Sequence, residues 1–141
     1  MAKMNMVEAI REGLKQEMAR DESVMLMGED VGHLGGVFRV TDGLQQLYSS
    51  RRVVDTPLAE SVITGSALGL ALTGWRPVVE IQFLGFTQQC FHQINQQISR
   101  VRFRTRSSQC APITIRSPFG GCVLTPEFHS DSMEQTFAQS S

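Results

Sequence analysis

The sequence has few cysteines, and those it has are scattered. Its three cysteines, Cys90, Cys110 and Cys122, form no CxxC pair, and no histidine stands at metal-ligand spacing from them. An odd, dispersed set predicts reduced thiols in a cytoplasmic-type compartment and argues against a disulfide framework or a zinc site. We therefore expect no metal site in this chain.

Long apolar runs and an excess of either charge are also missing. No stretch approaches the roughly 18 apolar residues that a membrane span needs. The first residues lead into a charged helical pattern, which is not typical of a signal or transit peptide. A formal net charge of -1 argues against a general nucleic-acid binder. We expect a soluble protein of the cytoplasm, or of the mitochondrial matrix if the source is eukaryotic.

What is present is an alternation of helical and strand patterns in a chain of single-domain size. Its 141 residues, 41% of them hydrophobic, are enough for a core. Short apolar runs predict strands at 24–27, 53–54, 77–83 and 112–116. Periodic segments predict helices at 7–18, 62–73, 87–100 and 132–138, with one more through Leu44 and Leu47. Thr41 or Asp42 is expected to cap that helix, and Pro57 to stand in the first turn of the next.

This order predicts an α/β fold, a parallel sheet with helices on both faces. Ligands of such sheets bind at the carboxyl ends of the strands. The residues just past the expected strands are Glu29 and Asp30, then 55–60, Phe86, 120–121 and His129. Two acids, an aromatic ring and a histidine at one edge predict a crevice capable of acid–base chemistry.

Five motifs in order resemble the β subunits of thiamine-diphosphate-dependent 2-oxo acid dehydrogenases, of the pyruvate or branched-chain type. They are GEDV at 28–31, GGVFRVT at 35–41, DTPLAES at 55–61, RPVVEIQF at 76–83 and IRSPFGG at 115–121. The HSDS at 129–132 is similar to a further element of that family. The similarity covers essentially the whole chain, so 1–141 is expected to be one pyrimidine-binding, transketolase-like domain.

The resemblance implies a function and partners. Such a β subunit binds the aminopyrimidine ring of thiamine diphosphate, while an α subunit holds the diphosphate and Mg²⁺. The enzyme decarboxylates a 2-oxo acid oxidatively and passes the acyl group to a lipoyl-lysine of an acyltransferase component. A second β subunit completes the assembly. Pyruvate and branched-chain 2-oxo acids both remain open as substrates, with a slight lean of the segment 115–118 toward branched-chain relatives.

The resemblance also implies roles for individual residues. Glu60 matches the glutamate that bonds the pyrimidine ring nitrogen and favours the imino tautomer; its alternative is an ordinary acid in a helix's first turn. Phe86 matches the ring that packs on the pyrimidine, and Glu29 an acid on a proton path between twin sites. Leu58 and Gln82 are expected to line the pocket. His129 matches the histidine that binds the acyl intermediate and passes it on.

The sequence departs from the family in three places. Gln88 and Gln89 replace a more usual pair after Phe86, and 122–126 replaces a glycine-rich loop; both flank the substrate mouth. Family β subunits are also more than twice as long, so we expect the domain to be incomplete at its C-terminus and the second domain to be absent. An edge strand and apolar helix surface would then be open.

Two other functions therefore stay open. One is a catalytically silent, truncated relative that acts as an assembly or interaction module. The other is a small-molecule or nucleic-acid binder on the same fold, using the arginines at positions 100, 102, 104 and 106. That basic stretch is otherwise expected to be a solvated face or a subunit contact.

Overall fold

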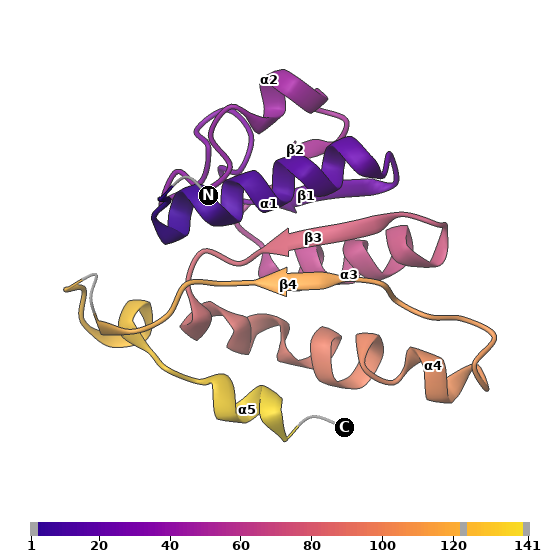
Figure 1. Cartoon of the computed structure of the whole chain (residues 1–141). Helices are drawn as coiled ribbons and strands as arrows, with labels where there is room; N and C mark the ends of the chain where they lie inside the picture. Colours follow the sequence, from indigo (N-terminus) through magenta and orange to yellow (C-terminus); the bar gives the residue numbers. More distant parts are fainter. Residues whose placement is uncertain (1–2, 122–123, 140–141) are drawn as a thin grey trace.

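The computed structural model describes residues 3–121 and 124–139. Its centre is a parallel sheet in the order β2–β1–β3–β4 (Figure 1). The strands are β1 (Val24–Gly28), β2 (Val53–Asp55), β3 (Arg76–Glu80) and β4 (Thr114–Arg116). All five residues of β1 are buried, as expected for a strand covered on both faces. The predicted α/β class and the parallel sheet are confirmed.

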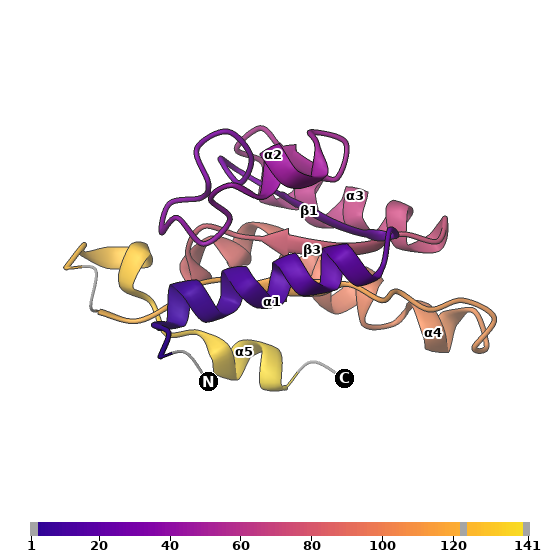
Figure 2. The same cartoon turned by 45° about the horizontal axis from the view of Figure 1, so that its top comes forward.

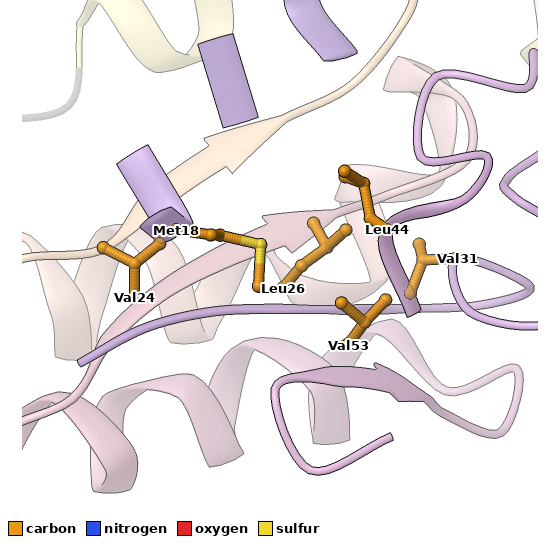
Figure 3. Close-up of a cluster of buried hydrophobic side chains, with 6 residues drawn as sticks. All are labelled: Met18, Val24, Leu26, Val31, Leu44 and Val53. Atoms are coloured by element: carbon orange, nitrogen blue, oxygen red, sulfur yellow. The ribbon is translucent and has the colours of Figure 1, made fainter. Parts of the chain in front are cut away.

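One face of the sheet is covered by α1 (Met6–Arg20) and α2 (Leu44–Tyr48). Figures 1 and 2 show α1 running across this face, with α2 near the β2 edge. The core beneath the two helices consists of six buried side chains: Met18, Val24, Leu26, Val31, Leu44 and Val53 (Figure 3). Alternate residues of β1 point to this side, because side chains along a strand alternate between its faces.

The opposite face carries α3 (Glu60–Leu72) and two irregular helical segments that follow β3 in the chain, η1 (Leu84–Cys90) and η2 (Gln93–Ile98). Their shared core contains Met27, Ile63, Ala67, Val79, Ile81 and Cys90. Ala67 is fully buried, so the small residues of α3 let its backbone approach the sheet. This layer places the first turn of α3 close to the carboxyl ends of the strands.

The helix predicted at 87–100 is not one regular helix. The segment η1 is a 3₁₀ helix, η2 is a π-helix, and a short α-helix, α4 (Val101–Arg104), follows. The Ser99 N–H donates to the carbonyl of Ile94 at 3.0 Å, which is the wide spacing of a π-turn. Apolar residues three and four apart suit all three helix types. The pattern therefore predicted a helical segment correctly but not its winding.

Other boundaries also differ from the expectations. No side chain caps α2, because Gly43 precedes it with φ of 80° and the Thr41 hydroxyl donates instead to the Val31 carbonyl at 2.6 Å. Pro57 lies outside α3, which begins at Glu60. The third strand ends at Glu80 and does not reach Phe83. The last predicted helix is confirmed as α5 (Glu134–Ala138), after a 3₁₀ turn, η4 (Glu127–Ser130).

No helix within residues 3–121 and 124–139 combines the length and apolar character needed to cross a bilayer. Cys90 and Cys110 are free thiols, as predicted, the first buried and the second exposed. Cys122, and with it part of the replaced loop at 122–126, lies outside the described residues.

Candidate functional site

The four strands end in register at one edge of the sheet. Gly28 is opposite both Asp55 and Glu80, and Glu80 is opposite Arg116. The loops that follow these strands therefore start side by side, as the sequence predicted. The Asp55 carboxylate accepts hydrogen bonds from two N–H groups of the glycine-rich loop, Gly32 at 2.6 Å and His33 at 3.1 Å. These bonds fix the loop that carries Glu29 and Asp30 against β2.

Glu60 is the first residue of α3 and is 4% exposed. Its Oε2 is buried and has no hydrogen-bond partner among the described residues. The Thr64 hydroxyl, one turn later, bonds the backbone carbonyl of Glu60 and not its carboxyl group. A buried carboxyl oxygen without a donor is costly, although the helix N-terminus offsets part of the cost. The oxygen is thus available to a donor that none of the described residues supplies.

A cavity of about 400 Å³ opens next to Glu60. Its lining consists of Leu58, Glu60, Gly85, Phe86, Gln88, Gln89 and Phe128. Three of the predicted pocket residues, Leu58, Glu60 and Phe86, are thereby brought together. The two glutamines that depart from the family pattern also lie here. The other two predicted cofactor-binding residues, Glu29 and Gln82, are half-buried after β1 and β3 and are not part of this lining among the described residues.

His129 lies in η4, and its half-buried ring contacts three phenylalanines. It stacks on Phe128 at 4.7 Å between ring centroids, and meets Phe83 at 4.8 Å and Phe86 at 5.1 Å edge-to-face. His129 is not itself among the described lining residues, but two of its neighbours, Phe86 and Phe128, are. The structure therefore places this histidine in contact with two aromatic residues of the cavity lining. Such ring pairs hold a side chain in one orientation.

Glu29 and Glu60 are close enough for their charges to interact. Partial burial raises the pKa of the Glu29 carboxyl, and the neighbouring charges of Asp30 and Glu60 raise it further. Two of the predicted acids are thus electrostatically coupled at the same strand edge. This placement agrees with the position expected for both residues, while their chemical roles stay predictions.

Several residues of the site carried no recognisable signal in the sequence. Cys90 is fully buried, and burial raises the pKa of its thiol to about 11, with the charge of Glu60 adding to the effect. A thiol of that kind is unreactive near neutral pH. Phe83, Gly85 and Phe128 also belong to the site through their contacts. Their type and spacing resemble those of ordinary core residues, so only the folded structure identifies them.

A second feature of this edge is a buried ion pair between Glu80 of β3 and Arg116 of β4. Burial raises the pKa of Glu80, and the charge of Arg116 opposes that shift. Burial likewise lowers the pKa of Arg116, against the attraction of Glu80. A Cβ added to Gly36 would lie 3.2 Å from Glu80 Oε1, so the glycine-rich loop packs directly on this pair. The pair joins two strands and one loop.

No cluster of three or more His, Cys, Asp or Glu side chains suited to a metal occurs in the part of the chain that the structure describes. In the basic stretch, the guanidinium of Arg104 donates to Gln97 Oε1 at 2.8 Å and to the carbonyl of Gln96 at 2.7 Å. Arg102 and Arg106 are exposed. This arrangement suits the solvated face that the sequence suggested.

Comparison with known proteins covers the whole chain. Residues 2–140 match the family described as transketolase, pyrimidine binding domain. The chain is 59% identical over 140 residues to the pyruvate dehydrogenase E1 component subunit beta of Staphylococcus epidermidis (strain ATCC 12228 / FDA PCI 1200). It is 57% identical over 140 residues to the protein of that name from Staphylococcus aureus (strain Mu50 / ATCC 700699). Both alignments cover 99% of this chain and 43% of the relative.

Proposed function

The chain belongs to the family of transketolase pyrimidine-binding domains, and on that basis we propose that it forms the cofactor-binding part of a 2-oxo acid dehydrogenase β subunit. Pyruvate is the proposed substrate, because the similar proteins from both Staphylococcus species carry pyruvate in their names. The chain spans less than half the length of those relatives, 43%. The activity of the whole subunit is therefore part of the proposal.

The observation that carries the proposal is the unpartnered Oε2 of Glu60 beside the cavity. A protonated ring nitrogen of an aminopyrimidine would satisfy this oxygen, and the Phe86 ring offers an apolar surface for the ring face. The residues thus fit the pyrimidine half of thiamine diphosphate. When bound, this cofactor supplies the carbanion chemistry that decarboxylation of a 2-oxo acid requires.

In this proposal Glu60 holds a proton at the pyrimidine nitrogen, and Leu58 and Phe86 exclude water from the ring. Glu29 lies on a proton path that links this site to its twin, and its raised pKa and charge interaction with Glu60 support that place. His129 contacts the acyl group and assists its transfer to a lipoyl-lysine. Its ring contacts Phe86, a lining residue of the cavity, and this closeness to the cavity supports that assignment. Gln82 remains a proposed contact that lies outside the described cavity lining.

The proposed partners follow from the proposal that this chain binds only the pyrimidine half of the cofactor. An α subunit would hold the diphosphate and Mg²⁺, a second β subunit would complete the tetramer, and a lipoyl acyltransferase would receive the acyl group. We place the protein in the cytoplasm of its cell, where such complexes have pyruvate and reduced thiols available.

The test is decarboxylation of pyruvate by the chain co-expressed with its α subunit. Thiamine-diphosphate-dependent release of CO₂ is measured for the wild type, Glu60→Gln and the control Glu22→Gln, an exposed acid at the other end of β1. We expect Glu60→Gln to lower turnover at least about 100-fold, because the amide cannot exchange the proton at the ring nitrogen. Glu22→Gln is expected to match the wild type.

Calorimetric titration with thiamine diphosphate separates the possible outcomes. Turnover that survives Glu60→Gln would contradict the proposed role of Glu60. Cofactor binding and α-subunit association without turnover would favour the assembly or interaction module. A chain that neither binds the cofactor nor associates with the α subunit would refute the proposed function.

A further inference from the structure

Gly85 lies where two separate segments of the site touch through their backbones. It is buried in η1, and a Cβ built on it would overlap the carbonyl oxygen of Phe128 in η4. The same Cβ would lie 2.9 Å from the carbonyl carbon of Phe128 and 3.0 Å from its Cβ. Backbone atoms cannot rotate away as a side chain tip does. Any side chain at position 85 must therefore push η1 and η4 apart.

Phe128 is followed directly by His129, so this contact governs the histidine as well. The His129 ring contacts Phe83, the residue just before η1, and Phe86 within η1. The distances between ring centroids are 4.8 Å and 5.1 Å. The ring of Phe128 in turn lies 5.5 Å from that of Phe86. A displacement of η4 by the size of a methyl group would loosen all of these contacts together, because aromatic pairs weaken outside a narrow range of separation.

We propose that Gly85 is a positioning residue: its missing side chain lets η4 lie against η1 and thereby fixes the His129 ring next to the cavity that contains Glu60 and Phe86. The structural part of this proposal rests on the contacts alone. Its catalytic consequence, misplacement of the acyl-transfer histidine, rests on the proposed function. Gly85→Ala is therefore expected to displace His129 through the backbone contact with residue 128, and because Gly85 also lines the cavity, the two steps of the reaction are measured separately.

The structural part is tested by NMR on the chain with labelled histidine, using His129→Gln to assign the signals. In the wild type, the ring protons of His129 should show nuclear Overhauser contacts to Phe83 and Phe86. Gly85→Ala should abolish these contacts and move the His129 resonances, while those of His33 in the loop after β1 stay in place. The matched control is Gly13→Ala in α1, where an added Cβ meets nothing within 4 Å; it should leave the His129 signals unchanged.

A second variant keeps the test decisive if Gly85→Ala does not fold. Phe128→Ala removes the stacked ring but leaves the backbone contact between Gly85 and residue 128. We expect the contacts of His129 with Phe83 and Phe86 to persist in Phe128→Ala, since the backbone contact sets the position. Their loss in Phe128→Ala, or their survival in a folded Gly85→Ala, would overturn the proposal.

The catalytic consequence is measured on the chain assembled with its α subunit. Gly85→Ala should lower acyl transfer to a lipoyl group by about 100-fold, the scale of a 1 Å misplacement. Because Gly85 and Phe86 also line the cavity, decarboxylation read with an artificial electron acceptor should fall as well, by at least about 10-fold less than acyl transfer. Equal losses in both steps would contradict the specific effect on His129. A wild type without any turnover would instead refute the proposed function, and the NMR result would still decide the role of Gly85.

Discussion

Glu29 shows how a single side chain responds to its place at the strand edge. Burial and the charges of Asp30 and Glu60 raise its pKa above the ordinary value of 4.5. A carboxyl group with a raised pKa binds its proton more tightly in the folded state than in the unfolded state. The free energy of unfolding therefore falls as pH rises from about 4.5 through the raised value.

Glu29→Gln should accordingly stabilise the chain at pH 7 and lose this advantage below about pH 4, where the unfolded carboxyl is protonated as well. The gain should be less than about 1 kcal/mol, because Glu29 is partly exposed and water screens its charge. Urea unfolding of Glu29→Gln at pH 7 and below about pH 4 measures this gain in the free energy of unfolding. Glu22→Gln is the control for an exposed acid. An equal gain at both pH values would contradict the electrostatic cause.

At the scale of elements, the ion pair of Glu80 and Arg116 joins β3 to the outermost strand. Both side chains are mostly removed from water, with 4% and 18% of their side-chain surface exposed. Removing only one member of such a buried pair strongly lowers the free energy of unfolding, because the remaining charge stays buried without a partner. The pair is also in contact with the glycine-rich loop through Gly36.

Arg116→Met should therefore lower the free energy of unfolding by about 3–5 kcal/mol. The double variant Glu80→Gln with Arg116→Met should recover much of that loss, since no ionised group is then left unpaired. The control is Arg76→Met, which removes an exposed pair with Asp21 (3.2 Å, 60% and 34% exposed) and should cost at most about 1 kcal/mol. Equal costs at the two sites, measured by urea unfolding, would show that burial of the pair is unimportant.

At the scale of the whole molecule, β4 is the last strand of the described sheet, and an apolar groove of about 680 Å³ runs between it and α1. Apolar side chains of α1, β3 and the loop after β4 line it, among them Ile10, Val78 and Phe119. Exposed apolar surface of this kind binds hydrophobic dyes and promotes association.

Phe119→Ser should lower the fluorescence of a bound naphthalene-sulfonate dye by about half or more, because Phe119 is 62% exposed in the groove. The matched control is Phe103→Ser, which removes an 89% exposed phenylalanine of α4 outside the groove. Equal decreases in the two variants would mean that the dye reports scattered surface rather than the groove. Sedimentation of both variants checks association in the same samples.

The sequence by itself determined the order of the elements and the strand edge that carries the chemistry. The apolar run of β1, the periodic pattern of α1 and the acids that follow each strand are local features, so they can be read without the fold. Glu60 and Phe86 were placed at this edge because they follow predicted strands, whereas the pocket roles of Leu58, Glu60 and Phe86 came from the family resemblance. The motifs around them indicated the family, which the comparison confirms.

Only the tertiary structure decided which distant residues complete that site. Gly85 meets Phe128, Cys90 lies beside Glu60, and Arg116 pairs with Glu80, each across a separation that no local pattern records. The apolar spacing of η1 and η2 suits several helix types, so their winding is not set by the local pattern. In the structure both segments pack on α3, and η1 also packs on η4. Local preferences set the elements, and contacts between them set the burial, the charges and the aromatic contacts of His129.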